Sequence, residues 1–95
     1  MQLVKSGIAG TLESGDILIE ITKKDSPGVD VELTSTVGNQ YGHQIKAVIR
    51  QTVQECGLDG VSVKANDKGS LDCTIRARVQ AAAYRGSECS DFCWE

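Results

Sequence analysis

The fold is constrained most by a strict two-residue alternation of apolar and polar side chains over residues 16–22. Three isoleucines, Ile17, Ile19 and Ile21, share one face, while Leu18 lies among polar residues on the other. Because successive side chains of a strand point to opposite faces of a sheet, this spacing predicts a β-strand with one buried face. Another layer of secondary structure must therefore cover the isoleucine face.

The same alternation predicts two further strands, over residues 29–34 and 61–66. Six residues, 23–28, separate the first two strands; they are rich in turn formers and include the single proline of the chain. A connection of this kind predicts a loose antiparallel hairpin between those strands.

A fourth strand is predicted over residues 71–80, after a tight turn at 67–69. Every second residue in this segment is apolar over five positions. Helical spacing fits as well, and it is set by Leu71, Ile75, Val79 and Ala82. The unbroken alternation after a turn favours the strand, followed by a short helix over residues 81–85.

Between the second and third strands the period changes from two to three and four. Apolar residues recur at that spacing from Tyr41 to Cys56, which predicts an amphipathic helix. Ser35 or Thr36 can cap its start, and Gly57 stands where a C-terminal glycine cap belongs.

This order of elements predicts an α+β fold, a small β-β-α-β-β sheet with one amphipathic helix packed on one face. A chain of 95 residues has room for one domain, which we expect over residues 1–86. Residues 87–95 are mostly small, polar or acidic and have no periodicity, so we expect a loose C-terminal tail.

Charge and hydropathy argue against two classes of partner. The formal net charge is −3 and no basic block is present, so we expect no nucleic-acid surface. No apolar run reaches the roughly 20 residues that span a bilayer, and the first residues do not resemble a signal peptide. We therefore expect a cytoplasmic protein that does not bind membranes.

The titratable side chains suited to catalysis or metal binding are few. His43 is the only histidine and lies off the apolar stripe of the helix, as an exposed residue would. Cys56 and Cys73 are expected to fill the core. Cys89 and Cys93 lie in the tail with three residues between them, and a zinc site needs about four ligands, so no metal site is predicted.

Ser14 stands just before the first strand, followed by Gly15 and flanked by Glu13 and Asp16. Such a Ser-Gly-Asp run is a common turn, which is the interpretation that local chemistry favours. The alternative is an exposed hydroxyl that a separate enzyme can reach and load with a phosphate-linked group. Gly15 would help by keeping bulk away from the hydroxyl.

Two motifs bear on this choice. The segment Ala-Gly-Thr-Leu-Glu-Ser at 9–14, followed by Gly15 and Asp16, resembles the amino-terminal signature of the citrate lyase acyl carrier protein family, the gamma chain. The segment Asp-Lys-Gly-Ser-Leu-Asp-Cys at 67–73, followed by Ile-Arg-Ala-Arg, resembles the second signature. The resemblance covers residues 8 to 85.

The resemblance implies that Ser14 carries a phosphoribosyl-dephospho-coenzyme A arm through a phosphodiester bond. The thiol of this arm would hold acetyl and citryl groups as thioesters and carry them between two larger partners, a transferase (alpha) and a lyase (beta) subunit. The chain itself would then be a non-catalytic carrier. From their position next to Ser14 alone, we expect Glu13, Gly15 and Asp16 to be recognised by the transferase that attaches the prosthetic group.

Other assignments remain open from the sequence. Arg76 and Arg78 are expected on the exposed face of the last strand, either solvated or in contact with the phosphates of the arm or with a partner.

Three alternative functions stay open. The chain could be the carrier of malonate decarboxylase, an assembly subunit whose serine is never loaded, or a small thiol-redox or metal protein.

Overall fold

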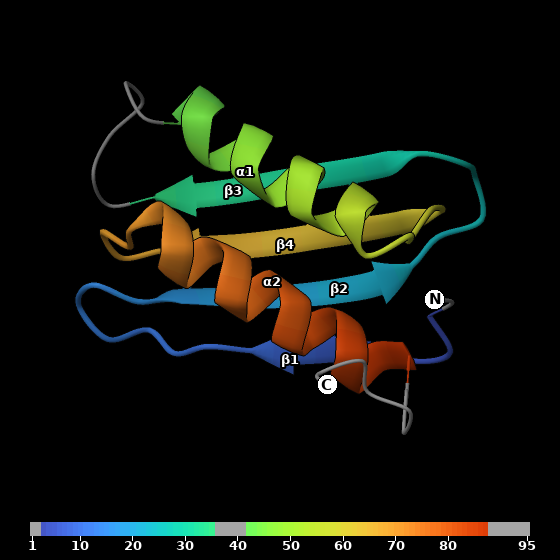
Figure 1. Ribbon diagram of the computed structural model, residues 1–95, viewed down its shortest axis with the longest axis horizontal. Coiled ribbons are helices and arrows are strands. Elements are labelled where there is room, and N and C mark those ends of the chain that lie inside the picture. The colour runs from blue at the N-terminus through green and yellow to red at the C-terminus, as the bar shows by residue number, and fades with distance from the viewer. Residues whose placement is uncertain (1–2, 36–41, 88–95) are drawn as a thin grey trace.

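The computed structural model describes residues 3–35 and 42–87, and this part of the chain forms one four-stranded sheet and two helices (Figure 1). The elements in chain order are β1 (Gly7–Ala9), β2 (Ile17–Lys23), β3 (Val29–Ser35), α1 (Gly42–Glu55), β4 (Val61–Asp67) and α2 (Asp72–Ser87). The predicted α+β class, with a small sheet covered on one face, is confirmed.

The strands are ordered β1-β2-β4-β3 across the sheet. β4 lies between β2 and β3, antiparallel to β2 and parallel to β3. The predicted hairpin between β2 and β3 is therefore wrong, because these two strands do not pair. A parallel pair needs a long crossover connection, and α1 supplies it between β3 and β4.

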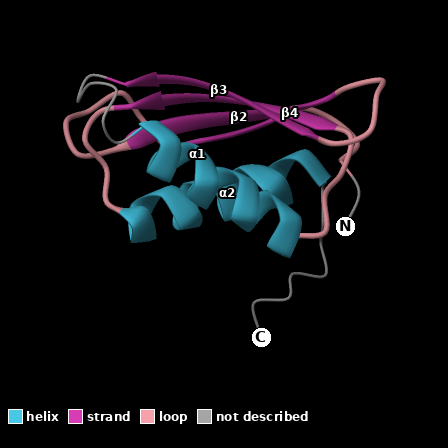
Figure 2. Cartoon of the chain, turned by 90° about the horizontal axis from the view of Figure 1, so that it is seen from above, coloured by secondary structure: helices cyan, strands magenta, loops and turns pink. Residues whose placement is uncertain are grey.

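On the inward face of the sheet, the side chains form rows in register across β2, β4 and β3. Ile21 of β2 stands opposite Val63 of β4, which stands opposite Val31 of β3. The next row continues with Ile19 and Ala65. The isoleucines predicted to share a buried face are all fully buried. Figure 2 shows the resulting two layers, the sheet on one side and both helices on the other.

The predicted central helix is confirmed as α1. Its buried face consists of Ile45, Val48, Ile49, Thr52 and Val53. Gly57 ends it as expected, with a φ of 75°. The N–H of Gly57 donates to the Gln54 carbonyl, and the N–H of Leu58 donates to the Val53 carbonyl. These are the two hydrogen bonds of a Schellman cap. At the other end, Tyr41 and Thr36 lie outside the described residues, and Ser35 belongs to β3.

The predicted last strand is wrong, because residues 72–87 form one long helix, α2. A strand over 71–80 would bury Cys73 and Ala77, and both are exposed. The helix instead buries Ile75 and Val79 and continues that face into the alanines that follow. The helix predicted over residues 81–85 is the second half of this longer one.

The short edge strand β1 packs directly against α2 through two glycines. A methyl group on Gly7 would lie 1.9 Å from the carbonyl oxygen of Ala82, and one on Gly86 would lie 2.4 Å from the Leu3 side chain. The backbones can approach this closely only without a Cβ. This contact joins the start of the described chain to the end of α2.

Ser87 closes α2, and the rest of the tail that we predicted over 87–95 lies outside the described residues. Among the described residues, neither helix has the length and hydrophobicity needed to cross a bilayer.

Candidate functional site

Ser14 lies in the loop of residues 10–16 that joins β1 to β2, and it is exposed. Gly15 beside it has a φ of 83°, a backbone conformation that glycine adopts without strain. A Cβ built on Gly15 meets no atom within 4 Å, so the space next to the serine is open. The loop thus presents a primary hydroxyl to solvent with no bulky neighbour at the following position.

The loop around Ser14 is held by hydrogen bonds among its own residues. The Thr11 hydroxyl donates to Asp16 Oδ2 over 2.7 Å and accepts from the Glu13 N–H over 3.2 Å. The Asp16 N–H donates to the Glu13 carbonyl, and the Ile17 N–H donates to Asp16 Oδ1. The exposed serine therefore sits on a fixed turn.

Arg78 of α2 anchors this turn to the helix layer. Its Nε donates to Asp16 Oδ1 over 2.9 Å and its Nη2 to Asp16 Oδ2 over 3.1 Å. The Asp16 side chain is only 13% exposed, whereas that of Arg78 is 40% exposed. The hydrogen bonds from Arg78, then those from Thr11 and Ile17, lower the pKa of Asp16 from 3.8 to about 2.

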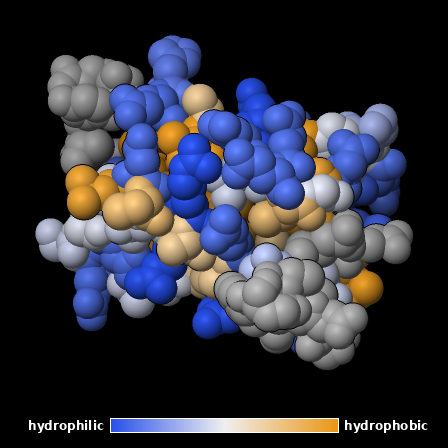
Figure 3. All heavy atoms as spheres, viewed as in Figure 1, coloured by the Kyte–Doolittle hydropathy of each residue, from blue (hydrophilic) through white to orange (hydrophobic). Residues whose placement is uncertain are grey.

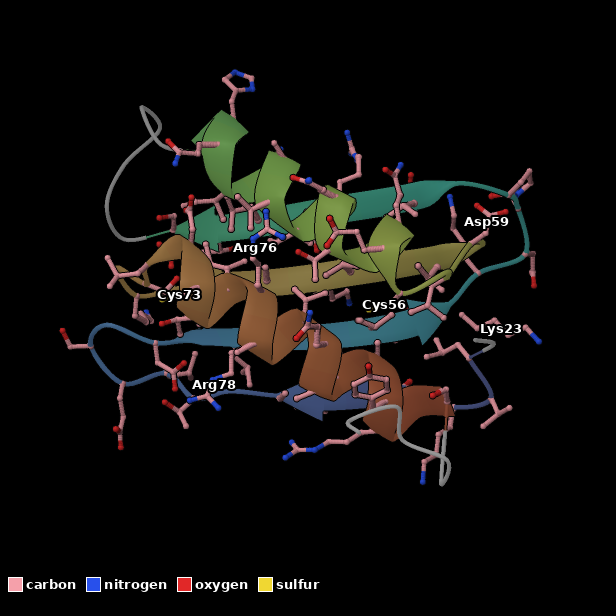
Figure 4. The ribbon with its side chains drawn as sticks, in the orientation of Figure 1. Lys23, Cys56, Asp59, Cys73, Arg76 and Arg78 are labelled. Atoms are coloured by element: carbon pink, nitrogen blue, oxygen red, sulfur yellow. The ribbon has the colours of Figure 1, made fainter. Side chains whose placement is uncertain are left out.

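Arg76 points elsewhere, toward α1. Its Nη1 lies 3.4 Å from Glu55 Oε1, and its Nη2 lies 3.5 Å from the Gln51 side-chain oxygen. Figure 4 shows the two arginines on different sides of α2, Arg76 beside α1 and Arg78 beside the loop after β1. The expectation that they share one face is wrong, because residues two apart on a helix point in different directions.

The Ser14 loop is also bonded to the turn that follows β4. The Gly15 N–H donates to the Lys68 carbonyl over 2.7 Å, and the Lys68 N–H donates to the Asp16 carbonyl over 2.9 Å. Figure 1 shows the two connections side by side at one end of the molecule. The two sequence motifs, more than fifty residues apart along the chain, thus meet at one place.

A buried carboxylate organises that second turn. Asp67 is fully buried and accepts hydrogen bonds from the Ser70 N–H and hydroxyl, the Gly69 N–H and the Ser35 hydroxyl. Burial would raise the pKa of Asp67, but these hydrogen bonds from Ser70, Gly69 and Ser35 outweigh it and lower the pKa. The sequence showed this residue only as part of a turn, and its partner Ser35 belongs to another strand.

Cys56, Cys73 and His43 do not belong to the loop of residues 10–16. Cys73 is exposed on α2, so the prediction that it fills the core is wrong. Cys56 is half-buried against the core, and burial raises the pKa of its thiol. His43 is exposed on α1, as expected. Cys89 and Cys93 lie outside the described residues.

Thr11 and Lys68 are the site residues that sequence reasoning missed. Thr11 falls inside the first motif, yet its bond to Asp16 depends on how the loop folds back. Lys68 falls inside the second motif and contributes through its backbone groups. Position in the two motifs was the only signal that could have found them.

The comparisons with known proteins agree with the motifs. The family model named ACP, described as the malonate decarboxylase delta subunit (MdcD), matches residues 4–86. A citrate lyase acyl carrier protein of Lacticaseibacillus casei is 50% identical over 95 residues, which are 100% of this chain and 93% of that protein.

Two more distant relatives bear the same kind of name. The citrate lyase acyl carrier protein 2 of Salmonella typhimurium is 44% identical over 94 residues, covering 99% of this chain and 97% of the relative. The citrate lyase acyl carrier protein of Streptococcus mutans is 40% identical over 95 residues, covering 100% and 93%. With identities of this size over nearly whole chains, the protein belongs to the citrate lyase acyl carrier protein family.

Proposed function

We propose that this protein is the acyl carrier subunit of a citrate lyase complex and that Ser14 is the covalent attachment site of its phosphoribosyl-dephospho-coenzyme A arm. The observation that carries the proposal is the exposed Ser14 on a turn fixed by Asp16 and Arg78. A carrier needs one reachable hydroxyl on a firm scaffold, and this loop has both properties.

The residues around Ser14 fit such a group. Attachment through a phosphodiester requires an accessible primary hydroxyl, and the space at Gly15 is open. The Arg78 guanidinium has one nitrogen, Nη1, outside its two bonds to Asp16, and its side chain is 40% exposed. We assign that nitrogen as a contact for phosphate on Ser14. When bound, the arm would supply the thiol that carries acetyl and citryl groups.

The loop also offers features that an attaching transferase can read. Glu13 and Gly15 are exposed beside Ser14, so we assign them to direct recognition. Asp16 is committed to Arg78 and Thr11, and its contribution is to set the shape of the turn. Activation of the Ser14 hydroxyl would come from the transferase, since none of the described residues hydrogen-bonds to it.

A carrier of this kind serves two larger subunits. The protein would pass acyl groups between the alpha (transferase) and beta (lyase) subunits of citrate lyase, without catalysing either step itself. Tethering keeps an acyl group at a local concentration of roughly millimolar, so that it reaches both active sites without diffusing away. Residues 1–86 would be the carrier domain, located in the cytoplasm.

A reconstitution with the two candidate sets of partner subunits tests the proposal. The loaded chain, with its arm thiol first acetylated so that citrate can displace acetate, is added to citrate lyase alpha and beta subunits with citrate, and oxaloacetate release is measured. We expect turnover with this chain and none with a Ser14→Ala chain. Because the family model is described as a malonate decarboxylase subunit, the same chain is offered to malonate decarboxylase subunits with malonate. Turnover there, and none with citrate, would contradict the assignment to citrate lyase.

A further inference from the structure

A hollow of about 440 Å³ opens at the same end of the molecule as Ser14. It lies between the first turn of α1, which contributes Gln44 and Ile45, and the turn into α2, which contributes Ser70 and Leu71. Its size falls in the range of pockets that hold small organic ligands. Ile45 is buried, whereas Leu71 is 70% exposed.

Leu71 is the most exposed of the large hydrophobic side chains among the described residues. A second one, Leu12, is 55% exposed and lies in the Ser14 loop itself. Figure 3 shows the helix-bearing face, where hydrophilic residues predominate and hydrophobic ones show in smaller groups between them. Leu71 lines the hollow, so an apolar group that enters it would cover a side chain now open to solvent.

The hollow is connected to the Ser14 loop through the backbone. Gly15 and Asp16 bond to both backbone groups of Lys68, and Gly69 and Ser70, which line the hollow, follow directly in the chain. An arm that starts at Ser14 therefore starts next to the rim. Tethering raises the effective concentration of its far end there, so weak contacts suffice for partial occupancy.

The charged groups differ along the path from Ser14 to the hollow. In the Ser14 loop the guanidinium of Arg78 is paired with the carboxylate of Asp16. The hollow contains two carboxylates instead, Asp67 on its floor and Asp72 at the start of α2. Gln44 donates to Asp72 Oδ2 over 3.3 Å and so links the two helices at its edge. An anionic group would be repelled by these carboxylates, whereas an uncharged chain with amide and methylene groups would not.

We propose that this hollow receives the uncharged, thiol-bearing end of the arm on Ser14, and that its carboxylates admit a neutral acyl group and exclude an anionic one. The inference rests on the proposed function, since it requires a loaded Ser14. The phosphates stay near Arg78, and the apolar stretch of the arm packs on Ile45 and Leu71. A neutral acetyl group would be bound in the hollow between reactions. An acyl group with free carboxylates would stay outside the hollow, where a partner subunit can bind it.

The test compares backbone amide NMR shifts of the full-length chain with and without the arm. Intact mass first establishes whether Ser14 is loaded. We expect loading to shift the amides of the Ser14 loop and also those that line the hollow, at residues 44–45 and 69–72. Loaded chain whose shifts are confined to the loop would overturn the inference while leaving the proposed function standing. Absence of any mass gain would overturn both.

Charge selection is tested with two caps on the arm thiol that differ by one charge. Iodoacetamide leaves a neutral cap and iodoacetate an anionic one. Cys56, Cys73, Cys89 and Cys93 are replaced by serine in every sample, and mass confirms a single alkylation. We expect the neutral cap to keep the shifts at 44–45 and 69–72 and the anionic cap to lose them. Equal shifts with both caps would refute the exclusion of anions.

A matched pair of variants tests whether the arm contacts the hollow at Leu71. Leu71→Asp adds a charge at the hollow and introduces a favourable N-cap residue for α2, so the helix should remain intact. Val4→Asp makes the same change at a side chain that is 60% exposed near the opposite end of α2. We expect Leu71→Asp to abolish the loading-induced shifts at 44–45 while mass gain is retained. Val4→Asp should leave them unchanged, and loss in both variants, or in neither, would contradict the inference.

Discussion

The Arg78 guanidinium donates two hydrogen bonds, of 2.9 and 3.1 Å, to the Asp16 carboxylate. This pair joins α2 to the loop that contains Ser14. A bidentate pair of this kind fixes direction as well as distance. Thr11 bonds to the same carboxylate, so the turn that presents the serine is oriented from two sides. The position of the Ser14 hydroxyl thus depends on α2.

This pair predicts a specific response to acid. The pKa of Asp16 is lowered from 3.8 to about 2 in the folded protein, so its contribution to stability is present above the unfolded value near 4 and is lost as pH falls toward 2. In urea unfolding at a series of pH values, stability should fall less steeply over this window in Asp16→Asn than in the parent. Asp67 is common to both chains and contributes equally.

Asp25→Asn is the control for that measurement, because Asp25 is an exposed carboxylate in the turn before β3. We expect Asp25→Asn to keep the steep acid dependence of the parent. If Asp16→Asn follows the same pH dependence as the parent, the Arg78–Asp16 pair does not hold the loop in solution.

Glu13 provides a test of recognition that is separate from stability. Its side chain is exposed and adjacent to Ser14, so Glu13→Gln should leave the fold intact and remove one charged contact with the attaching transferase. Loss of one charge-assisted hydrogen bond should lower the rate of loading about tenfold. Time-resolved intact mass measures this rate, with Glu32→Gln on β3 as control. An unchanged rate in Glu13→Gln would remove Glu13 from the recognition surface.

Two substitutions in α2 distinguish the helix from the strand that the alternation predicted. Ile75 is fully buried and Ala77 is exposed, whereas a strand would bury both. We expect Ile75→Ala to lower the free energy of unfolding by about 2–5 kcal/mol. Ala77→Glu should change it by less than about 0.5 kcal/mol. Denaturant unfolding measures both, and a large loss in Ala77→Glu would contradict the helix.

Local patterns predicted those parts of the fold that local forces determine. The alternation of Ile17, Ile19 and Ile21 and the cap at Gly57 each depend on neighbouring residues, and both predictions were confirmed. The order of the strands was not predicted, because β4 inserts between β2 and β3 through contacts distant in sequence. Residues 71–80 fit both periods, and packing of this segment against β1, β2 and α1, which are distant in sequence, favours the helix.

The same distinction holds at the site. Ser14 was found through its motif, which is local, and its exposure agrees with the prediction. The pairing of Arg78 with Asp16 was not foreseen, because Arg78 was expected on the exposed face of a strand, either solvated or in contact with the phosphates of the arm or with a partner. Its pairing with Asp16, 62 residues away, exists only once α2 has formed and packed on the sheet.

The close contact between β1 and α2 can be tested by adding a methyl group at Gly7. Gly7→Ala would place a methyl group 1.9 Å from a backbone oxygen of Ala82, so the edge strand or the helix must move. We expect a loss of about 1–3 kcal/mol in the free energy of unfolding. Gly42→Ala is the matched control, since a Cβ there meets nothing within 4 Å. Equal stability of Gly7→Ala and the parent would show that this contact is looser than described.

The central claim is that the Ser14 hydroxyl carries the arm, and intact mass of the natively produced chain tests it most directly. The chain and its Ser14→Ala variant are produced together with the attaching transferase and its activated donor. We predict a gain of one phosphoribosyl-dephospho-coenzyme A group on the parent and none on Ser14→Ala. A parent chain without added mass, or a Ser14→Ala chain that gains the same mass, would contradict it.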